Sequence, residues 1–141
     1  MDMKKWMNEF ETEHYSILAL TQSGQYSSRA GGILPILKPL VNDAAFFEQA
    51  VVIDKVIGKA AALLLIKGKV KFIHGNLMSL SAKETLEKAG IDFSYHQLCQ
   101  RIQNKTQTDI CPMEASVLEV GNPEIAYQIL SKKLSHVLYG E

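Results

Sequence analysis

The sequence lacks several features that would assign a class of protein at once. Its two cysteines, Cys99 and Cys111, are too few for a disulfide framework, and we expect both to stay reduced inside a cell. Fifteen basic residues balance fifteen acidic ones, so no net charge favours binding to nucleic acid or to an anionic membrane. The longest apolar run, residues 60–66, falls far short of the roughly 20 residues needed to span a bilayer. The sequence therefore predicts neither nucleic acid nor a membrane as a partner.

What is present is the composition of a globular protein. The chain has 141 residues, of which 47% are hydrophobic and 21% charged, and a chain of this size usually forms one core. The N-terminal residues run into Asn8, Glu9 and Glu11 instead of a hydrophobic signal core. We expect a single domain over residues 1–141 and a cytoplasmic location.

Hydrophobic spacing and turn residues predict the order of the elements. Helices are expected at residues 3–14, 33–41, 60–66, 81–89, 111–120 and 125–137, and strands at 15–21, 26–30, 50–53, 70–78 and 93–98. The helix at 60–66 is apolar nearly all round and must be covered on most faces. An early hairpin, then alternating strands and helices, predicts an α/β fold of three α-β-α layers with a mixed sheet.

Local signals refine four of these boundaries. Asp54 follows an apolar strand and precedes a helix, which predicts that its carboxylate is a helix N-cap. Ser81 and Glu84 have the spacing of a capping box. Gly68 and Gly90 are expected to end the helices that precede them.

Four residues have reactive or ionisable side chains and stand at or near the start of a predicted helix. Cys111 precedes Pro112, and free N–H groups there stabilise a thiolate, so Cys111 is either a nucleophile or a small buried side chain. Glu114 follows in the first turn, where a carboxylate stabilises the helix dipole regardless of any chemistry. Lys59 stands between Gly58 and the apolar helix, a context in which its amine can pair with Asp54 or Glu114.

Polar residues next to these positions are candidate ligand-binding groups. Those before the helix predicted at 111–120 can hydrogen-bond a ligand, although single residues of this kind more often form turns and caps. Two more candidates lie between Asp54 and the helix predicted at 60–66. The complete candidate set is Asn104, Thr106, Thr108, Lys55 and Gly58.

Two segments of the chain are distinctive, Val52-Ile53-Asp54-Lys55-Val56-Ile57-Gly58-Lys59-Ala60-Ala61-Ala62 and Asn104-Lys105-Thr106-Gln107-Thr108-Asp109-Ile110-Cys111-Pro112-Met113-Glu114. Both resemble a small prokaryotic family of unknown function whose fold is similar to that of cytidine deaminase. The order of the predicted elements also matches this family. The resemblance implies a cytidine-deaminase-like fold in which the two segments meet where deaminases have their pocket, at helix N-termini that favour an anion or a polar ligand.

The resemblance does not extend to the deaminase zinc site. Deaminases of this fold open one core helix with a His or Cys followed by a catalytic Glu, and the next with Pro-Cys-x-x-Cys, so that three ligands hold Zn²⁺. None of the four histidines is followed two residues later by Glu, and Cys111-Pro112-Met113-Glu114 lacks the paired thiolates. We therefore expect no metal site, no cofactor and no zinc-dependent deamination.

The sequence leaves three functions open. The leading one is binding of a small nucleotide- or nucleoside-like ligand between the two segments, an inference from fold analogy. The second is a zinc-independent enzyme in which Cys111 attacks an electrophile while Lys59, Asp54 or Glu114 handles protons. The third is a structural or regulatory interaction module, for which a homodimer is the commonest assembly.

Overall fold

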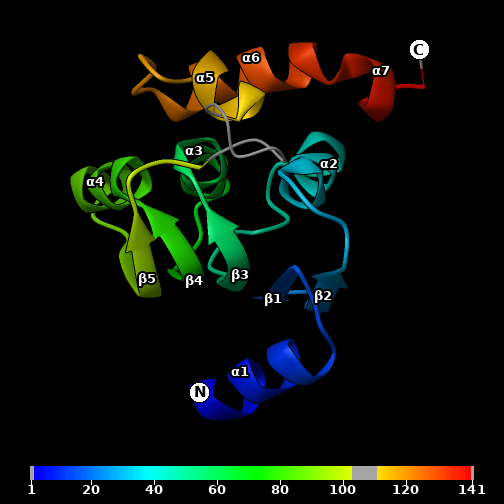
Figure 1. Ribbon diagram of the computed structural model, residues 1–141. Coiled ribbons are helices and arrows are strands. Elements are labelled where there is room, and N and C mark those ends of the chain that lie inside the picture. Colours follow the sequence, from blue (N-terminus) through cyan, green and yellow to red (C-terminus); the bar gives the residue numbers. More distant parts are fainter. Residues whose placement is uncertain (1, 103–110, 141) are drawn as a thin grey trace.

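A computed structural model describes residues 2–102 and 111–140 of the chain (Figure 1). Its centre is a five-stranded sheet with the strand order β2-β1-β3-β4-β5. The strands are β1 (Ile17–Thr21), β2 (Gly24–Ser28), β3 (Val51–Ile57), β4 (Phe72–Ser79) and β5 (Asp92–Cys99). Strand β1 pairs antiparallel with β2 and β3, whereas β3, β4 and β5 run parallel. The predicted α/β class with a mixed sheet is confirmed.

The helices cover the sheet unequally (Figure 1). Helix α1 (Met3–Thr12) lies on one face, and α2 (Leu34–Asn42), α3 (Lys59–Lys67) and α4 (Leu80–Ala89) lie on the other. Helices α5 (Pro112–Ser116), α6 (Pro123–Lys133) and α7 (Ser135–Leu138) form a further layer outside α2 to α4. The three layers expected from the sequence are therefore extended by a fourth, because α5 and α6 pack on α3 and α7 packs on α6.

Helix α3 occupies the middle of the core. Its residues from Ala60 to Leu65 are all buried, since the sheet lies below the helix and α6 lies above it. The prediction that this apolar helix is covered on most faces is confirmed. Each of its buried leucines, Leu63, Leu64 and Leu65, stabilises the fold by roughly 1.5–3 kcal/mol through removal of its side chain from water.

A smaller apolar cluster attaches α1 to the opposite face of the sheet. Phe10 of α1 packs with Leu18 of β1 and Ile53 of β3, and Trp6 and Met7 flank them. The three- and four-residue spacing in residues 3–14 predicted this amphipathic helix, and the side chain of Asp2 caps it by accepting from the backbone N–H of Lys5.

The structure moves one predicted boundary that bears on function. Strand β3 continues through Asp54 to Ile57, and Gly58 is the residue before α3. The prediction of Asp54 as the N-cap of that helix is therefore wrong. Residues 54–57 stay extended because they pair with β4 in parallel register, Asp54 opposite Gly75 and Ile57 opposite Met78.

Other boundaries shift for equally local reasons. The hydroxyl of Ser79 accepts from the N–H of Ala82 and caps α4, so the predicted capping box at Ser81 is wrong. Gly90 ends α4 in the left-handed conformation, as expected. The predicted helix at 111–120 stops at Ser116, and the predicted helix at 125–137 is divided at Leu134 into α6 and α7.

Within residues 2–102 and 111–140, no helix combines the length and the apolar character needed to cross a membrane.

The close packing of β3 on β4 gives a test of this fold. A Cβ at Gly75 would lie 2.9 Å from Cγ1 and 3.2 Å from Cβ of Ile57. Gly75→Ala should therefore destabilise the chain by about 1–3 kcal/mol, the usual cost of overpacking. Urea denaturation would measure it. Gly121→Ala, where no atom lies within 4 Å of the new methyl group, is the matched control and should change stability by less than about 0.5 kcal/mol. Equal effects of the two variants would contradict this packing.

Candidate functional site

The N-terminus of α3 is capped by a residue that lies far along the chain. Gly58, at the N-cap position, has no side chain to accept from the free backbone N–H groups of the helix. Glu114 of α5 takes this role, and its Oε2 accepts from the N–H of Ala60 at 2.7 Å. A carboxylate at this position also interacts favourably with the helix dipole.

Gly58 is required for this contact. A Cβ at Gly58 would overlap Oε1 of Glu114 and would lie 2.8 Å from Cγ1 of Ile102. The backbone of Gly58 is extended, with φ −99°, a conformation that any residue can adopt. Other residues are therefore excluded by the lack of space for a side chain. The absence of a side chain at Gly58 therefore allows Glu114 to approach the start of α3.

Glu114 is almost fully buried. Burial raises the pKa of its carboxyl group, and hydrogen bonds from the backbone of Ala60 and Lys59, together with the charge of Lys59, act in the opposite direction. The ammonium group of Lys59 does not reach into the same space, because its Nζ donates to the carbonyl oxygen of Leu118 at 2.8 Å.

Asp54 is a second buried carboxyl group, with 8% of its surface exposed. Its Oδ1 accepts from the N–H of Val56 at 3.1 Å. Burial raises the pKa of Asp54 to about 8, although backbone hydrogen bonds from Val56 and Lys55 lower it in part. Burial therefore favours the uncharged carboxylic acid, which can donate as well as accept a hydrogen bond.

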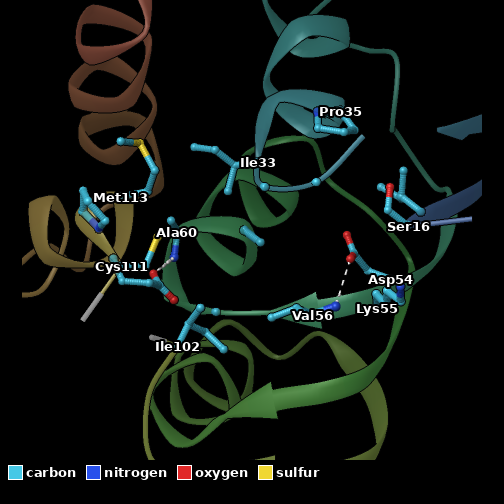
Figure 2. A pocket seen from close by; sticks show the side chains of 17 residues that line it. Ser16, Ile33, Pro35, Asp54, Lys55, Val56, Ala60, Ile102, Cys111 and Met113 are labelled. Carbon is cyan, nitrogen blue, oxygen red and sulfur yellow. Dashed lines mark hydrogen bonds between the residues drawn. The ribbon is translucent and has the colours of Figure 1, made fainter. Parts of the chain in front are cut away.

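The two carboxyl groups line one cavity of about 480 Å³ (Figure 2). It lies at the carboxyl end of β3, where ligands usually bind in open sheets with parallel strands, and its volume is typical of sites for small molecules. In Figure 2 the carboxyl group of Asp54 points into the space from the side of Ser16, and Cys111 and Met113 lie at the other end. Most of the wall between these ends is apolar, formed by Ile33, Pro35, Val56, Ala60, Ala61 and Ile102.

The structure brings together most of the residues that the sequence singled out. Asp54, Lys55, Gly58, Cys111 and Glu114 all line the cavity. Lys59 does not line it. The remaining candidates, Asn104, Thr106 and Thr108, lie outside the described residues.

Cys111 reaches the cavity from the start of α5. Its backbone N–H donates to the carbonyl oxygen of Ile102 at 2.9 Å, which holds this end of α5 next to the wall. The side chain is half-buried and makes no capping hydrogen bond. The other cysteine, Cys99, is not among the residues that line the cavity.

Sequence reasoning missed the wall contributed by the residue before β1 and by the segment between β2 and α2. Ser16, Gly31 and Gly32 line the cavity with the start of α2. The signal available was the pair Gly31-Gly32 before a helix, which indicated only the end of a strand. Nothing in the sequence placed this segment opposite Asp54, because the contact depends on the antiparallel pairing of β1 with β3.

A separate polar network lies on β4 and β5, away from the cavity. Nδ1 of His74 lies 2.7 Å from Oγ of Ser94, and Nε2 lies 3.1 Å from Oδ1 of Asn76. Burial is the main cause that lowers the pKa of His74. In the part of the chain that the structure describes, no three His, Cys, Asp or Glu residues come close enough together to hold a metal ion.

Fold and site together define an α/β protein with a mixed five-stranded sheet and a cavity lined by two buried carboxyl groups. Residues 5–134 match the family described as a domain of unknown function, DUF1893, and the chain belongs to this family. It is similar to the crystal structure of a DUF1893 family protein (TM1506) from Thermotoga maritima, with 31% sequence identity and a TM-score of 0.85. The similarity covers 93% of this chain and 88% of the Thermotoga protein. No protein of curated function matches the sequence.

The cap on α3 predicts coupling between Gly58 and Glu114. Glu114→Ala leaves the buried N–H of Ala60 without an acceptor and should cost about 1–3 kcal/mol. Gly58→Ala displaces the same carboxylate and should cost a similar amount. In the double variant the displaced group is already gone, so the cost should be smaller than the sum. Urea denaturation measures all three, with the exposed Glu119→Ala as the control; additive costs would contradict the contact.

Asp54 predicts a dependence of stability on pH. Its pKa is about 8 in the folded chain and about 3.9 in an unfolded one. Between these values the folded state holds a proton that the unfolded state releases, so the free energy of unfolding falls as pH rises, by up to about 1.4 kcal/mol per pH unit. This contribution is fully present below the unfolded pKa and is lost as pH passes through about 8. When the free energy of unfolding is measured by urea denaturation from pH 5 to 8, it should fall less steeply with pH for Asp54→Asn than for the unaltered chain. The raised pKa of Glu114 acts in the same direction, and Glu114→Gln separates the two.

Proposed function

We propose that the chain binds a small nucleoside-like ligand in the cavity between Asp54 and Glu114. The observation that carries the proposal is a mainly apolar cavity of about 480 Å³ that is lined by two buried carboxyl groups, Asp54 and Glu114. Apolar walls suit a planar ring, and a few fixed polar groups give orientation, which is the usual construction of a small-molecule site. Buried carboxyl groups with raised pKa values in a cavity are common at functional sites, and Asp54, unlike Glu114, caps no helix.

The ligand class rests on analogy of fold. We propose that the chain has a cytidine-deaminase-like path, supported by the hairpin followed by three parallel strands that are joined through α3 and α4. In such a path the segments at residues 54–59 and 111–114 flank the site where deaminases hold a nucleoside. The lack of basic side chains buried beside the two carboxyl groups, among the described lining residues, favours a nucleoside over the phosphates of a nucleotide within the cavity itself.

A second candidate function is zinc-independent catalysis by Cys111. The observation that favours it is that this thiol lines the same cavity as Asp54 and Glu114. A thiolate there would attack an electrophilic atom of the bound ligand while one of the carboxyl groups transfers a proton. Lys59 has no part in this version, because its amine is held by Leu118.

The proposal predicts stabilisation by the right ligand. A nucleoside at 100 times its Kd should raise the free energy of unfolding by about 2.7 kcal/mol, which corresponds to an increase in Tm of about 5–10 °C for a chain of this size. A thermal-shift screen of nucleosides, nucleotides and their bases measures this. Absence of any shift would argue for the interaction-module alternative, and sedimentation would then show whether the chain is a homodimer.

The two cysteines report where a ligand binds. Bound nucleoside should protect Cys111 from alkylation by iodoacetamide, since this thiol lines the cavity, and should leave Cys99 unprotected. Mass spectrometry of the Cys99→Ser and Cys111→Ser variants separates the two rates. Protection of Cys99 alone would place the ligand elsewhere. Release of a chemically altered nucleoside that depends on Cys111 would favour the enzymatic alternative.

A further inference from the structure

The sheet ends in a strand whose outer edge is free. Strand β5 pairs with β4 on one side, and no strand lies on its other side in the part of the chain that the structure describes (Figure 1). The backbone N–H and C=O groups along such an edge can pair with another extended segment. Strand β2 forms the opposite edge of the sheet, but it has five residues against the eight of β5. Strand β5 therefore offers the longer template for a partner.

Strand β5 lacks the features that usually block pairing at an edge. It contains no lysine, arginine or proline, and its one charged residue, Asp92, stands at the start. Its register with β4 is the same at both ends, Phe72 opposite Asp92 and Ser79 opposite Cys99, so no residue is inserted as a bulge. Tyr95, in the middle, is 38% exposed, and tyrosine is a residue type enriched at protein interfaces.

The side chains in the first half of β5 alternate between the two faces of the sheet. Phe93 packs against the core cluster that contains α3, and Tyr95 stacks on Phe93, so both point to this core side. Ser94 points to the other face, which we call the α1 side. Its Oγ lies 2.7 Å from Nδ1 of His74, whose neighbour in β3, Ile53, packs with α1.

The alternation changes once, directly after His96. His96 faces the α1 side, because its neighbour Asn76 belongs to the polar network on that face. Leu98 packs against the core cluster again, although strict alternation would place it on the face of His96. Gln97 is exposed, and its neighbour Leu77 packs on neither core cluster, which places Gln97 on the α1 side as well.

This change of face makes the edge complementary to itself in one register. Two antiparallel strands must place side chains that lie opposite each other on the same face. With a two-fold axis directly after His96, Tyr95 lies opposite Leu98 of the second copy, and both are on the core side. Ser94 then lies opposite Cys99, and both are on the α1 side. Any other position of the axis within the strand places at least one core-side residue opposite a residue of the other face.

The charges at the two ends of β5 also favour an antiparallel second copy. Asp92 begins the strand and Arg101 follows its end, and both side chains are exposed. The same register places Asp92 opposite Arg101 of the second copy, and the two-fold axis repeats this pair. Parallel pairing of two β5 strands would instead place like charges together.

We propose that β5 pairs with β5 of a second copy of this chain, antiparallel about a two-fold axis between His96 and Gln97, so that two five-stranded sheets form one continuous sheet in a homodimer. The interface does not depend on the ligand proposed above. An edge of eight residues buries less surface than a standard interface, so the dimer should form at micromolar concentrations.

Sedimentation equilibrium of the full chain tests the assembly. The mass should approach twice 15.7 kDa as the concentration rises to about 300 μM. Tyr95→Lys places a charge opposite Leu98 of the second copy and should raise the Kd of the dimer at least about tenfold. Tyr139→Lys is the matched control, because Tyr139 is an exposed tyrosine outside β5. Circular dichroism checks that both variants fold.

A single added thiol tests the register. In Ser94→Cys the new thiol lies opposite Cys99 of the second copy, where the Cα atoms of an antiparallel pair are about 4.5–5.5 Å apart and a disulfide can form. Within one chain the two positions are about 16 Å apart along the strand, too far to join. Oxidation should therefore give a covalent dimer that mass spectrometry shows to be linked from position 94 to Cys99. Ser23→Cys, at an exposed position in the hairpin turn, should give none.

Charge reversal tests the two ends of the interface. Asp92→Arg places two like charges together at each end and should raise the Kd of the dimer by about three- to tenfold. Combining Asp92→Arg with Arg101→Asp restores opposite charges and should restore the Kd.

Three results would overturn the inference. The first is a chain that stays monomeric at the highest concentration. The second is a dimer that Tyr95→Lys leaves intact, because its interface would then lie elsewhere. The third is a linkage from position 94 to a thiol other than Cys99, because the strands would then pair in a register that the side-chain directions do not favour.

Discussion

The hydrogen bond from the N–H of Ala60 to Glu114 joins parts of the chain that are 54 residues apart and organises the site around it. It places α5 against the start of the most buried helix of the core. It also places Cys111 and Met113 beside the cavity. Gly58 is the condition for this contact, because any side chain at that position would occupy the space of the carboxylate.

The two buried carboxyl groups have different partners. Burial raises the pKa of Glu114, and backbone N–H groups at a helix N-terminus offset part of this increase. Asp54 has fewer compensating partners, and the desolvation of its carboxyl group prevails. One cavity thus contains a carboxyl group that acts mainly as a helix cap and another that is free to hydrogen-bond a ligand as an acid.

Much of the fold could be predicted from the sequence because periodicity and turn residues carry local information. The hairpin, the buried α3 helix and the end of α4 at Gly90 all followed from local patterns. The boundary at Asp54 was wrong because a polar residue before a helix predicts a cap, whereas pairing with a neighbouring strand keeps residues 54–57 extended. The boundary at Ser81 was wrong because α4 begins at Leu80 and Ser79 provides the cap. The layer formed by α5 to α7 was missed since amphipathic helices do not specify which surface they cover.

The candidate site shows the same division between local and distant information. Asp54, Gly58, Cys111 and Glu114 were identified as chemically capable residues, but the pairing of Glu114 with Ala60 depends on a tertiary contact that no spacing encodes. Lys59 was placed with them by sequence proximity, and its long side chain instead reaches the carbonyl oxygen of Leu118. Ser16 and Gly31 were not identified because they reach the cavity only through the packing of the hairpin and α2.

The position of the outer helical layer has a consequence for the order of assembly during synthesis. The sheet and the three helices on it come from residues before position 100, whereas the cap on α3 and one end of the cavity come from residues after position 110. A nascent chain can therefore form most of its core before the pocket has a second wall. Binding of the proposed ligand therefore requires that α5 has already docked on the N-terminus of α3.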